Sequence, residues 1–179
     1  TIEKTASMSW GFVPLTNYQG TDPRAVLEPL SEHLTDYEQL MIQYYGAGVQ
    51  ACYRGPRLYD TETTRQMVAK TINWYKKYRS VLNADMIQLR RADGRDWDGL
   101  IHVDPSSKQK ALGMLYNPTK EKITRTIPVP LYYTGLTTTA TLALKDDKAT
   151  AKKYTLNRNH ELLLTVTIEP ESYTWFTIE

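Results

Sequence analysis

The spacing of apolar residues changes its period once along the chain, close to residue 85. Before that point two short apolar runs, Met8–Leu15 and Val49–Tyr53, each precede a longer stretch whose apolar residues recur every three or four positions. Short apolar runs are typical of buried strands, and the wider spacing is typical of amphipathic helices. The order strand, helix, strand, helix predicts the repeating unit of a parallel α/β sheet.

The two helices have recognisable ends in the sequence. The first is expected from about Pro29 to Tyr45, and the glycines after it supply a C-terminal stop. The second is expected to begin after Asp60, which is suited to cap its N-terminus, and to end near Asn83. Its buried stripe is expected to include Val68, Thr71, Ile72, Tyr75 and Leu82.

From Met86 onward apolar and polar residues alternate, and turn signals separate short runs. Such a pattern predicts an antiparallel β-sandwich. The expected strands are Met86–Arg90, Trp97–Val103, Lys110–Tyr116, Ile123–Val129, Thr138–Leu144, Lys153–Leu156, Leu162–Ile168 and Tyr173–Ile178. The predicted fold class is therefore α/β plus all-β. Residues 1–85 look like the last two βα units of a (β/α)-barrel, and residues 86–179 form the sandwich.

Composition narrows the functional classes. Lysine and arginine number 22 against 20 acidic residues, which gives a net charge of +2 and no electrostatic footprint for nucleic acid. No stretch approaches the roughly 20 apolar residues of a membrane-spanning helix. The single cysteine, Cys52, excludes an internal disulfide and a cysteine-built zinc site. We predict no metal, no cofactor, no nucleic-acid partner and no membrane span.

The chain opens at Thr1, in a polar run just ahead of an expected interior strand. We therefore expect a piece of a longer protein, whose N-terminal remainder is a partner of this chain. For that parent protein we expect a periplasmic or extracellular location.

Candidate binding residues follow the two expected parallel strands, because functional groups gather in the loops after strand carboxyl ends. Tyr18 and Asp22 lie in the first loop, and Arg54 and Arg57 lie in the second. Side chains of these kinds hydrogen-bond the hydroxyls of sugars, so a carbohydrate is the predicted ligand. Structural roles are the alternative: loop scaffolding for the first pair, and binding of backbone carbonyls or of Asp60 for the arginines.

Aromatic residues of the second region could supply a surface on which a sugar stacks. Trp97 lies in the polar stretch Asp96–Asp98 and is the best exposed candidate, so we predict it as a sugar-binding residue. Half of the aromatics in a sandwich face its core, and Trp175 is expected to be among them. The aromatics of this region include Trp97, Tyr116, Tyr132, Tyr133, Tyr173 and Trp175.

Catalytic residues are not identifiable. His33, His102 and His160 lack metal-ligand spacing, and no Ser-His-Asp signature, phosphate loop or dinucleotide fingerprint occurs. Glycoside hydrolysis needs a pair of carboxylates. Asp22 and Asp60 are the only candidates, and each is better explained as a helix cap.

The stretch Tyr53–Asp60 is similar to the C-terminal portion of large bacterial glycoside hydrolases that carry a (β/α)₈ barrel followed by a β-sandwich, broadly like the α-galactosidase superfamily. Other stretches fit the same pattern: Trp10–Leu15, Glu28–Leu34, Trp74–Arg79, Gly99–Pro105, Tyr116–Thr119 and Pro130–Leu136. The resemblance implies that residues 8–84 supply the seventh and eighth barrel strands with their helices. It also implies that the catalytic acid and nucleophile lie before Thr1.

Three hypotheses follow. The leading one is a C-terminal fragment of a carbohydrate-active hydrolase that contributes part of the substrate rim, without the catalytic pair. The second is a non-catalytic carbohydrate-binding module in which Trp97 carries binding. The third is a structural or interaction domain that forms a homodimer through the apolar surface of an incomplete barrel.

Overall fold

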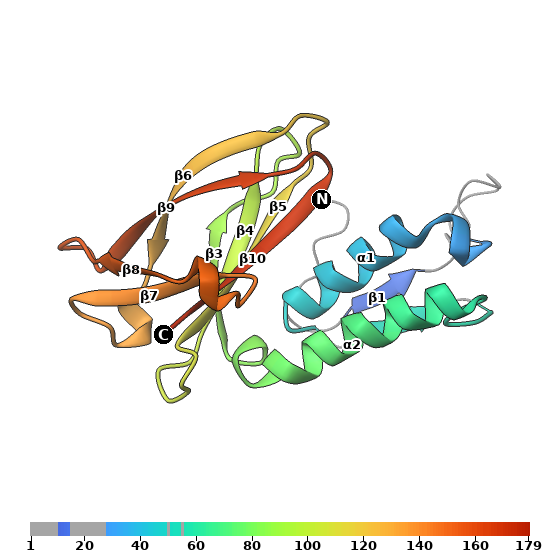
Figure 1. The fold of residues 1–179 in the computed structure, drawn as a ribbon, viewed down its shortest axis with the longest axis horizontal. Helices are drawn as coiled ribbons and strands as arrows, with labels where there is room; N and C mark the ends of the chain where they lie inside the picture. Colours follow the sequence, from blue (N-terminus) through green and yellow to red (C-terminus); the bar gives the residue numbers. More distant parts are fainter. Residues whose placement is uncertain (1–10, 15–27, 50, 55) are drawn as a thin grey trace. The chain divides into compact units, whose positions relative to one another are not determined.

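A computed structural model of the chain describes residues 11–14, 28–49, 51–54 and 56–179. By their contacts these residues fall into two compact units, one ending at Leu82 and the other running from Asn83 to Glu179 (Figure 1).

The first unit contains a parallel strand pair and two helices. Strand β1 (Gly11–Pro14) pairs in parallel with β2 (Ala51–Arg54), so that Gly11 lies opposite Ala51 and Pro14 opposite Arg54. A short 3₁₀ helix η2 (Leu30–Glu32) and helix α1 (Leu34–Gly46) lie between the strands, and helix α2 (Glu62–Leu82) follows β2. The predicted strand–helix–strand–helix order is confirmed.

Buried side chains of α1, α2 and the segment before them form the core of this unit. The rings of Tyr45 and Tyr75 stack across the two helices, with their centroids 4.7 Å apart. Tyr37 is fully buried, as the three-to-four spacing of its apolar neighbours indicates. The buried residues of this cluster are Leu30, Tyr37, Leu40, Met41, Tyr45 and Val68.

The start of the first helix differs from the prediction. The α-helix begins at Leu34 rather than near Pro29, because Pro29 is extended and His33 leaves the helical region at φ −124° and ψ 31°. Leu30 belongs to the separate 3₁₀ turn, yet its side chain is fully buried. The apolar pattern therefore predicted correctly that Leu30 is buried, but wrongly that it belongs to the α-helix.

The second unit is an antiparallel β-sandwich, as predicted. Its larger sheet has six strands in the order β3-β4-β5-β10-β7-β8, and its smaller sheet pairs β6 with β9. The strands are β3 (Asp85–Arg90), β4 (Asp98–Val103), β5 (Ala111–Asn117), β6 (Ile123–Pro130), β7 (Thr139–Leu144), β8 (Lys152–Thr155), β9 (Glu161–Ile168) and β10 (Ser172–Ile178).

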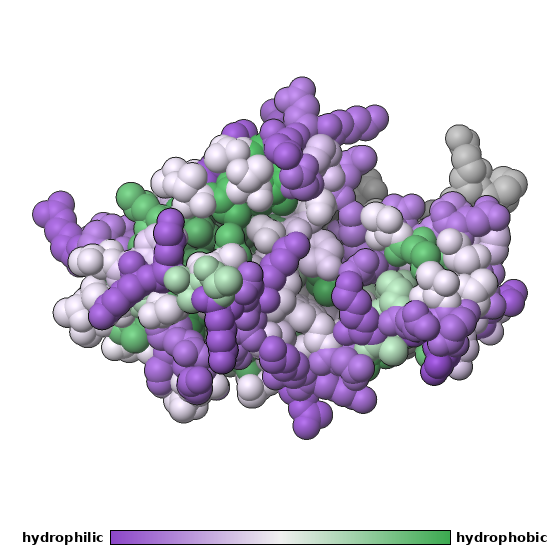
Figure 2. Space-filling model, in the orientation of Figure 1, coloured by the Kyte–Doolittle hydropathy of each residue, from purple (hydrophilic) through white to green (hydrophobic). Residues whose placement is uncertain are grey.

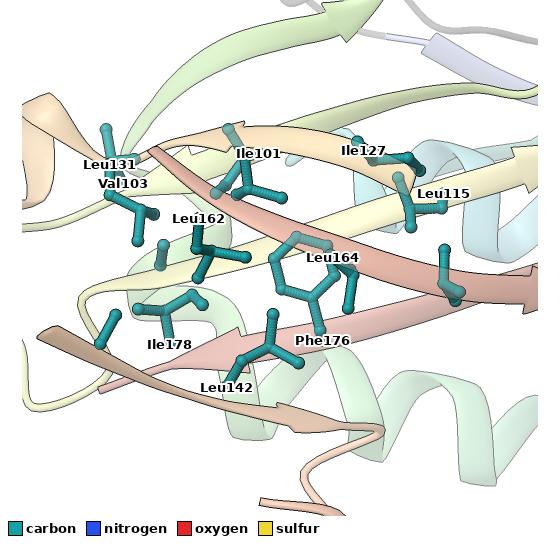
Figure 3. Packing of buried hydrophobic residues seen from close by; sticks show 14 of the residues in the cluster. Ile101, Val103, Leu115, Ile127, Leu131, Leu142, Leu162, Leu164, Phe176 and Ile178 are labelled. Carbon is teal, nitrogen blue, oxygen red and sulfur yellow. The ribbon is translucent and has the colours of Figure 1, made fainter. Parts of the chain in front are cut away.

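Alternate residues of the smaller sheet face the sandwich core. In β9 the residues Leu162, Leu164 and Val166 are buried, whereas Leu163 and the two threonines, Thr165 and Thr167, are exposed. These threonines meet partners on β6: the hydroxyls of Thr124 and Thr167 lie 2.8 Å apart. Figure 3 shows the inward-pointing side chains of β9 meeting those of the larger sheet, including Phe176, Leu142 and Ile178.

Part of the sandwich core lines a hollow at the surface. A hollow of about 490 Å³ lies between β7, β8 and β9, and Leu142, Leu144 and Leu164 are among its lining residues. Figure 2 shows apolar residues at the surface of the sandwich unit, set among strongly polar ones. Among the described residues, no helix is long and apolar enough to cross a membrane.

Candidate functional site

Parallel pairing of β1 and β2 places the carboxyl ends of both strands at one edge. Pro14 and Arg54 are opposite each other in the last register position, so the two strands end side by side. The first loop, which contains Tyr18 and Asp22, lies outside the described residues, and so does the side chain of Arg54. The described part of the second loop is residues 56–61, which we call the rim loop.

The rim loop is held by the residues that lead into α1 and by α1 itself. The buried hydroxyl of Tyr37 donates a hydrogen bond of 2.8 Å to the backbone carbonyl of Leu58. Burial, together with the neighbouring Tyr45, raises the pKa of Tyr37 well above its ordinary value, so the group remains a donor. A buried neutral phenol thus fixes the middle of the loop.

Asp60 forms a second anchor between the loop and the 3₁₀ turn. Its Oδ2 accepts hydrogen bonds from the backbone N–H and the hydroxyl of Ser31, at 2.9 and 3.0 Å. Its Oδ1 accepts from the hydroxyl of the fully buried Thr64 at 2.7 Å. Partial desolvation opposes ionisation, but these hydrogen bonds outweigh it and lower the pKa of Asp60 to about 2. Asp60 is a structural anion at neutral pH.

The capping role predicted for Asp60 belongs to its neighbour. The carbonyl of Thr61 accepts the first hydrogen bond of α2, from the N–H of Arg65 at 3.0 Å. The hydroxyl of Thr61 accepts from the N–H of Thr64 at 3.3 Å, which is the N-cap geometry. The prediction of Asp60 as the cap is therefore wrong by one residue, because Asp60 instead binds Ser31 across 29 positions of sequence.

Arg57 is the cationic group of the rim loop. Its Nε lies 3.3 Å from Oε1 of Glu28, and the guanidinium side chain is 54% exposed. A structural role considered for Arg57 is an ion pair with Asp60. Among the described residues that ion pair is not found, and Arg57 pairs with Glu28 instead. An ion pair this exposed contributes little to stability, about 0–1 kcal/mol. Much of the Arg57 donor set thus faces solvent.

Leu58 and Tyr59 complete the rim loop. They are 39% and 48% exposed, although the backbone beside them is fixed by Tyr37 and Asp60. The loop therefore presents a cation, a phenol ring and an aliphatic side chain on an anchored backbone. Its one carboxylate accepts hydrogen bonds on both oxygens, so the loop offers no free acid for catalysis.

The predicted exposure of Trp97 is wrong. Its side chain is only 9% exposed and belongs to the sandwich core, beside residues such as Ile101 and Leu115. The flanking aspartates misled the prediction, because they serve local structure. Asp96 accepts from the Trp97 N–H at 2.8 Å and pairs with Arg125, and Asp98 is itself buried.

The exposed aromatic residues of the sandwich lie elsewhere. Tyr132 and Tyr133, in the 3₁₀ helix η3 (Tyr132–Thr134), are 66% and 65% exposed. The sequence pattern Leu131–Thr134 contains no alternation that distinguishes them from core residues; only the neighbouring Gly135 signals a turn. Within the described residues, no group of three or more histidine, cysteine, aspartate or glutamate side chains could hold a metal ion.

Three solved structures illustrate the fold likeness. The galactosidase domain of an α-galactosidase–sucrose kinase superposes with a TM-score of 0.58 at 15% identity, over 93% of this chain and 22% of that one. A β-L-arabinopyranosidase from Geobacillus stearothermophilus gives 0.56 at 13% identity, over 95% of this chain and 37% of the other. The α-amylase of Geobacillus thermoleovorans gives 0.54 at 13%, over 79% and 32%.

All three are glycoside hydrolases. The chain spans between a fifth and two fifths of their lengths, and it matches their C-terminal regions, so the resemblance expected from the sequence is confirmed at the level of the fold. The arabinopyranosidase has been solved with arabinose and the amylase with acarbose. Neither a scan of protein-family models nor a search of curated protein sequences finds a match.

Proposed function

We propose that this chain is the C-terminal part of a carbohydrate-active glycoside hydrolase. In this proposal β1, α1, β2 and α2 are the last two βα units of a (β/α)₈ barrel, and the sandwich is an accessory domain. The catalytic carboxylates belong to the part of the parent protein before Thr1. The rim loop then borders the substrate.

The observation that carries the proposal is the anchored rim loop at the carboxyl end of a parallel strand pair. Barrel enzymes place their substrates at this end of their strands. Tyr37 and Asp60 hold the loop backbone, while Arg57 and Tyr59 face outward. The fold likeness to galactosidase and arabinopyranosidase structures supports a sugar as the ligand.

Arg57 is the residue with the most clearly defined role in the proposal, which is to bind sugar hydroxyls. A guanidinium presents several N–H donors in a fixed plane, which suits adjacent hydroxyls of a sugar ring. Tyr59 supplies an aromatic face beside it. Tyr18, Asp22 and Arg54 are proposed as further contacts, on the sequence pattern alone.

Two measurements test the proposal. The chain by itself should hydrolyse none of a panel of aryl glycosides, because it lacks the carboxylate pair; turnover that survives repurification would contradict the upstream location of the catalytic groups. In a longer form of the protein that includes the preceding residues, Arg57→Ala should raise KM about tenfold with a smaller change in kcat.

Arg65→Ala is the matched control for that variant. Arg65 is as exposed as Arg57 and pairs within α2 with Glu62, so its loss should leave KM unchanged. If both variants raise KM equally, the loss of a positive charge anywhere on the surface explains the result. The proposal that Arg57 contacts the substrate is then contradicted.

The homodimer expected from an incomplete barrel stays a prediction. Sedimentation of the chain at several concentrations tests it. A monomer at all concentrations would remove the dimer hypothesis without touching the proposed rim loop.

A further inference from the structure

We propose that Tyr132 and Tyr133 form a second carbohydrate-binding surface, on the sandwich unit, against which a sugar unit of a polysaccharide chain packs its apolar C–H face. We call these two residues the tyrosine platform. They are the most exposed large apolar or aromatic side chains of the described residues, at 66% and 65%. In contrast, the two tryptophans of this unit, Trp97 and Trp175, are buried.

The rings of the platform are held in fixed orientations. The centroids of Tyr132 and Tyr133 lie 5.3 Å apart with their planes at 89°, and Tyr132 meets the ring of His160 at 5.5 Å and 79°. Tyr132 thus has a nearly perpendicular ring from each of two neighbours. Edge-to-face contacts of this kind are favourable, and a side chain ordered in advance loses less entropy when a ligand binds.

The backbone beneath the platform is also fixed. Leu131, fully buried, donates its N–H to the carbonyl of His160 at 2.8 Å, which joins the platform to the turn before β9. Thr134 closes the 3₁₀ turn with an N–H bond of 3.0 Å to Leu131, and Gly135 follows in the left-handed region at φ 77°. Two exposed aromatic rings therefore stand on a base tied to the sandwich.

The area of the platform decides between a protein partner and a small ligand. An aromatic side chain buries about 150–250 Å² at most, so two of them supply less than the roughly 800 Å² per partner of a stable protein interface. The neighbours Gly135 and Thr137 are exposed and add little apolar surface. The exposed face of one such ring instead matches the apolar C–H face of a single sugar unit, and the second ring, whose plane is nearly perpendicular, can contact the edge of that unit.

The polar groups around the rings suit the same ligand. Each tyrosine carries a phenolic hydroxyl, and the turn of His160 also contains the exposed Arg158 and Asn159. Hydroxyl, amide and guanidinium groups can bind sugar hydroxyls while the rings take the apolar face. The choice of ligand class rests on the proposed function.

The test is affinity gel electrophoresis of the full chain in gels that contain galactomannan, amylopectin or xylan, with sedimentation on microcrystalline cellulose as a fourth probe. At least one polysaccharide should retard the chain. Tyr132→Ala combined with Tyr133→Ala should weaken that binding about tenfold or more, because the stacking area of both rings is lost. Tyr132→Trp should preserve it, since a larger ring still stacks.

Two controls separate the platform from other causes. Leu163→Ala removes an apolar side chain of similar exposure (59%) from the same unit and should leave retardation unchanged. Arg57→Ala tests the rim loop. If Arg57→Ala abolishes polysaccharide binding and the double tyrosine variant does not, this inference is overturned and the proposed function stands. No retardation by any probe, or retardation that the double variant keeps, also overturns it.

Discussion

The hydroxyl of Tyr37 and the carbonyl of Leu58 are joined by a 2.8 Å hydrogen bond across 21 positions of sequence. The donor is fully buried, whereas Leu58 extends its side chain into solvent. This contact fixes the backbone of the rim loop, while the side chains of Leu58 and Tyr59 remain exposed to solvent.

Tyr37→Phe should loosen the rim loop with little change to the helix core. The phenyl ring keeps the packing, but the Leu58 carbonyl loses its partner, which should cost about 1 kcal/mol of stability. Amide exchange should quicken in residues 56–61 and stay unchanged in β9. Tyr59→Phe, at an exposed ring, is the control and should alter neither; equal exchange rates in Tyr37→Phe and wild type would show that the bond does not hold the loop.

Asp60 should make the first unit sensitive to acid. Its pKa of about 2 in the folded protein lies below the ordinary value near 4, so its contribution to stability is present above pH 4 and disappears as the pH falls through 2. Asp60→Asn has one acceptor oxygen and cannot bind both Ser31 and Thr64 through carboxylate oxygens. The variant should be less stable than wild type at neutral pH.

Urea denaturation at several pH values checks the acid dependence. The difference between wild type and Asp60→Asn should be constant from pH 7 to 4 and shrink toward pH 2. A difference that persists unchanged at pH 2 would show that the charge of Asp60 is not the cause.

Asn117 should be the most sensitive polar position of the sandwich. Its buried side-chain amide donates to the carbonyls of Glu121, Ile168 and Glu169, at 2.7, 3.2 and 2.9 Å, and so ties the end of β5 to the end of β9. Asn117→Ala leaves these carbonyls without their donor and should destabilise the sandwich by about 2–4 kcal/mol.

The matched control is Asn159→Ala, at an exposed turn, which should change stability by less than about 0.5 kcal/mol. Asn117→Asp should be at least as harmful as alanine, because it sets carboxylate oxygens against carbonyl oxygens. Thermal unfolding followed by near-ultraviolet circular dichroism measures both. An aspartate variant as stable as wild type would contradict the donor role.

Gly113 should not tolerate a side chain. A Cβ at this position would collide with the ring of Phe176, which is fully buried on the adjacent strand β10. Gly113→Ala should therefore cost about 2–3 kcal/mol through overpacking. Combining it with Phe176→Leu should cost less than the sum of the single variants, since the smaller side chain makes room. Strict additivity would indicate that the ring is not the obstacle.

The sequence pattern predicted most elements. A strand or helix that buries one face has apolar residues at regular intervals, and this spacing can be recognised within a single segment. The predicted strand Leu162–Ile168 corresponds to β9 (Glu161–Ile168), and its alternation matches the observed burial. The period could not give the order of strands in the sheets. That order depends on contacts such as the pairing of Thr174 with Leu115, which are distant in sequence.

Predictions from local composition were wrong where a polar side chain stabilises the fold by binding nearby backbone or by being buried. The aspartates around Trp97 indicated solvent, but one of them binds the tryptophan backbone and the other is buried. At the rim loop the sequence predicted a polar cluster at a strand end, but it could not reveal that Asp60 binds Ser31 instead of capping α2. The anchoring contacts are long-range, so no local window contains them.

The position of β10 has a consequence for how the sandwich is made. In the larger sheet β10 lies between β5 and β7, both of which precede it in the chain. As a ribosome releases the polypeptide, the strands β3 to β5 and the pair β7–β8 emerge as separate halves with an open seam. The sheet becomes continuous only when Ser172–Ile178 has entered that seam, so its assembly should wait until every other strand of the sheet has been synthesised.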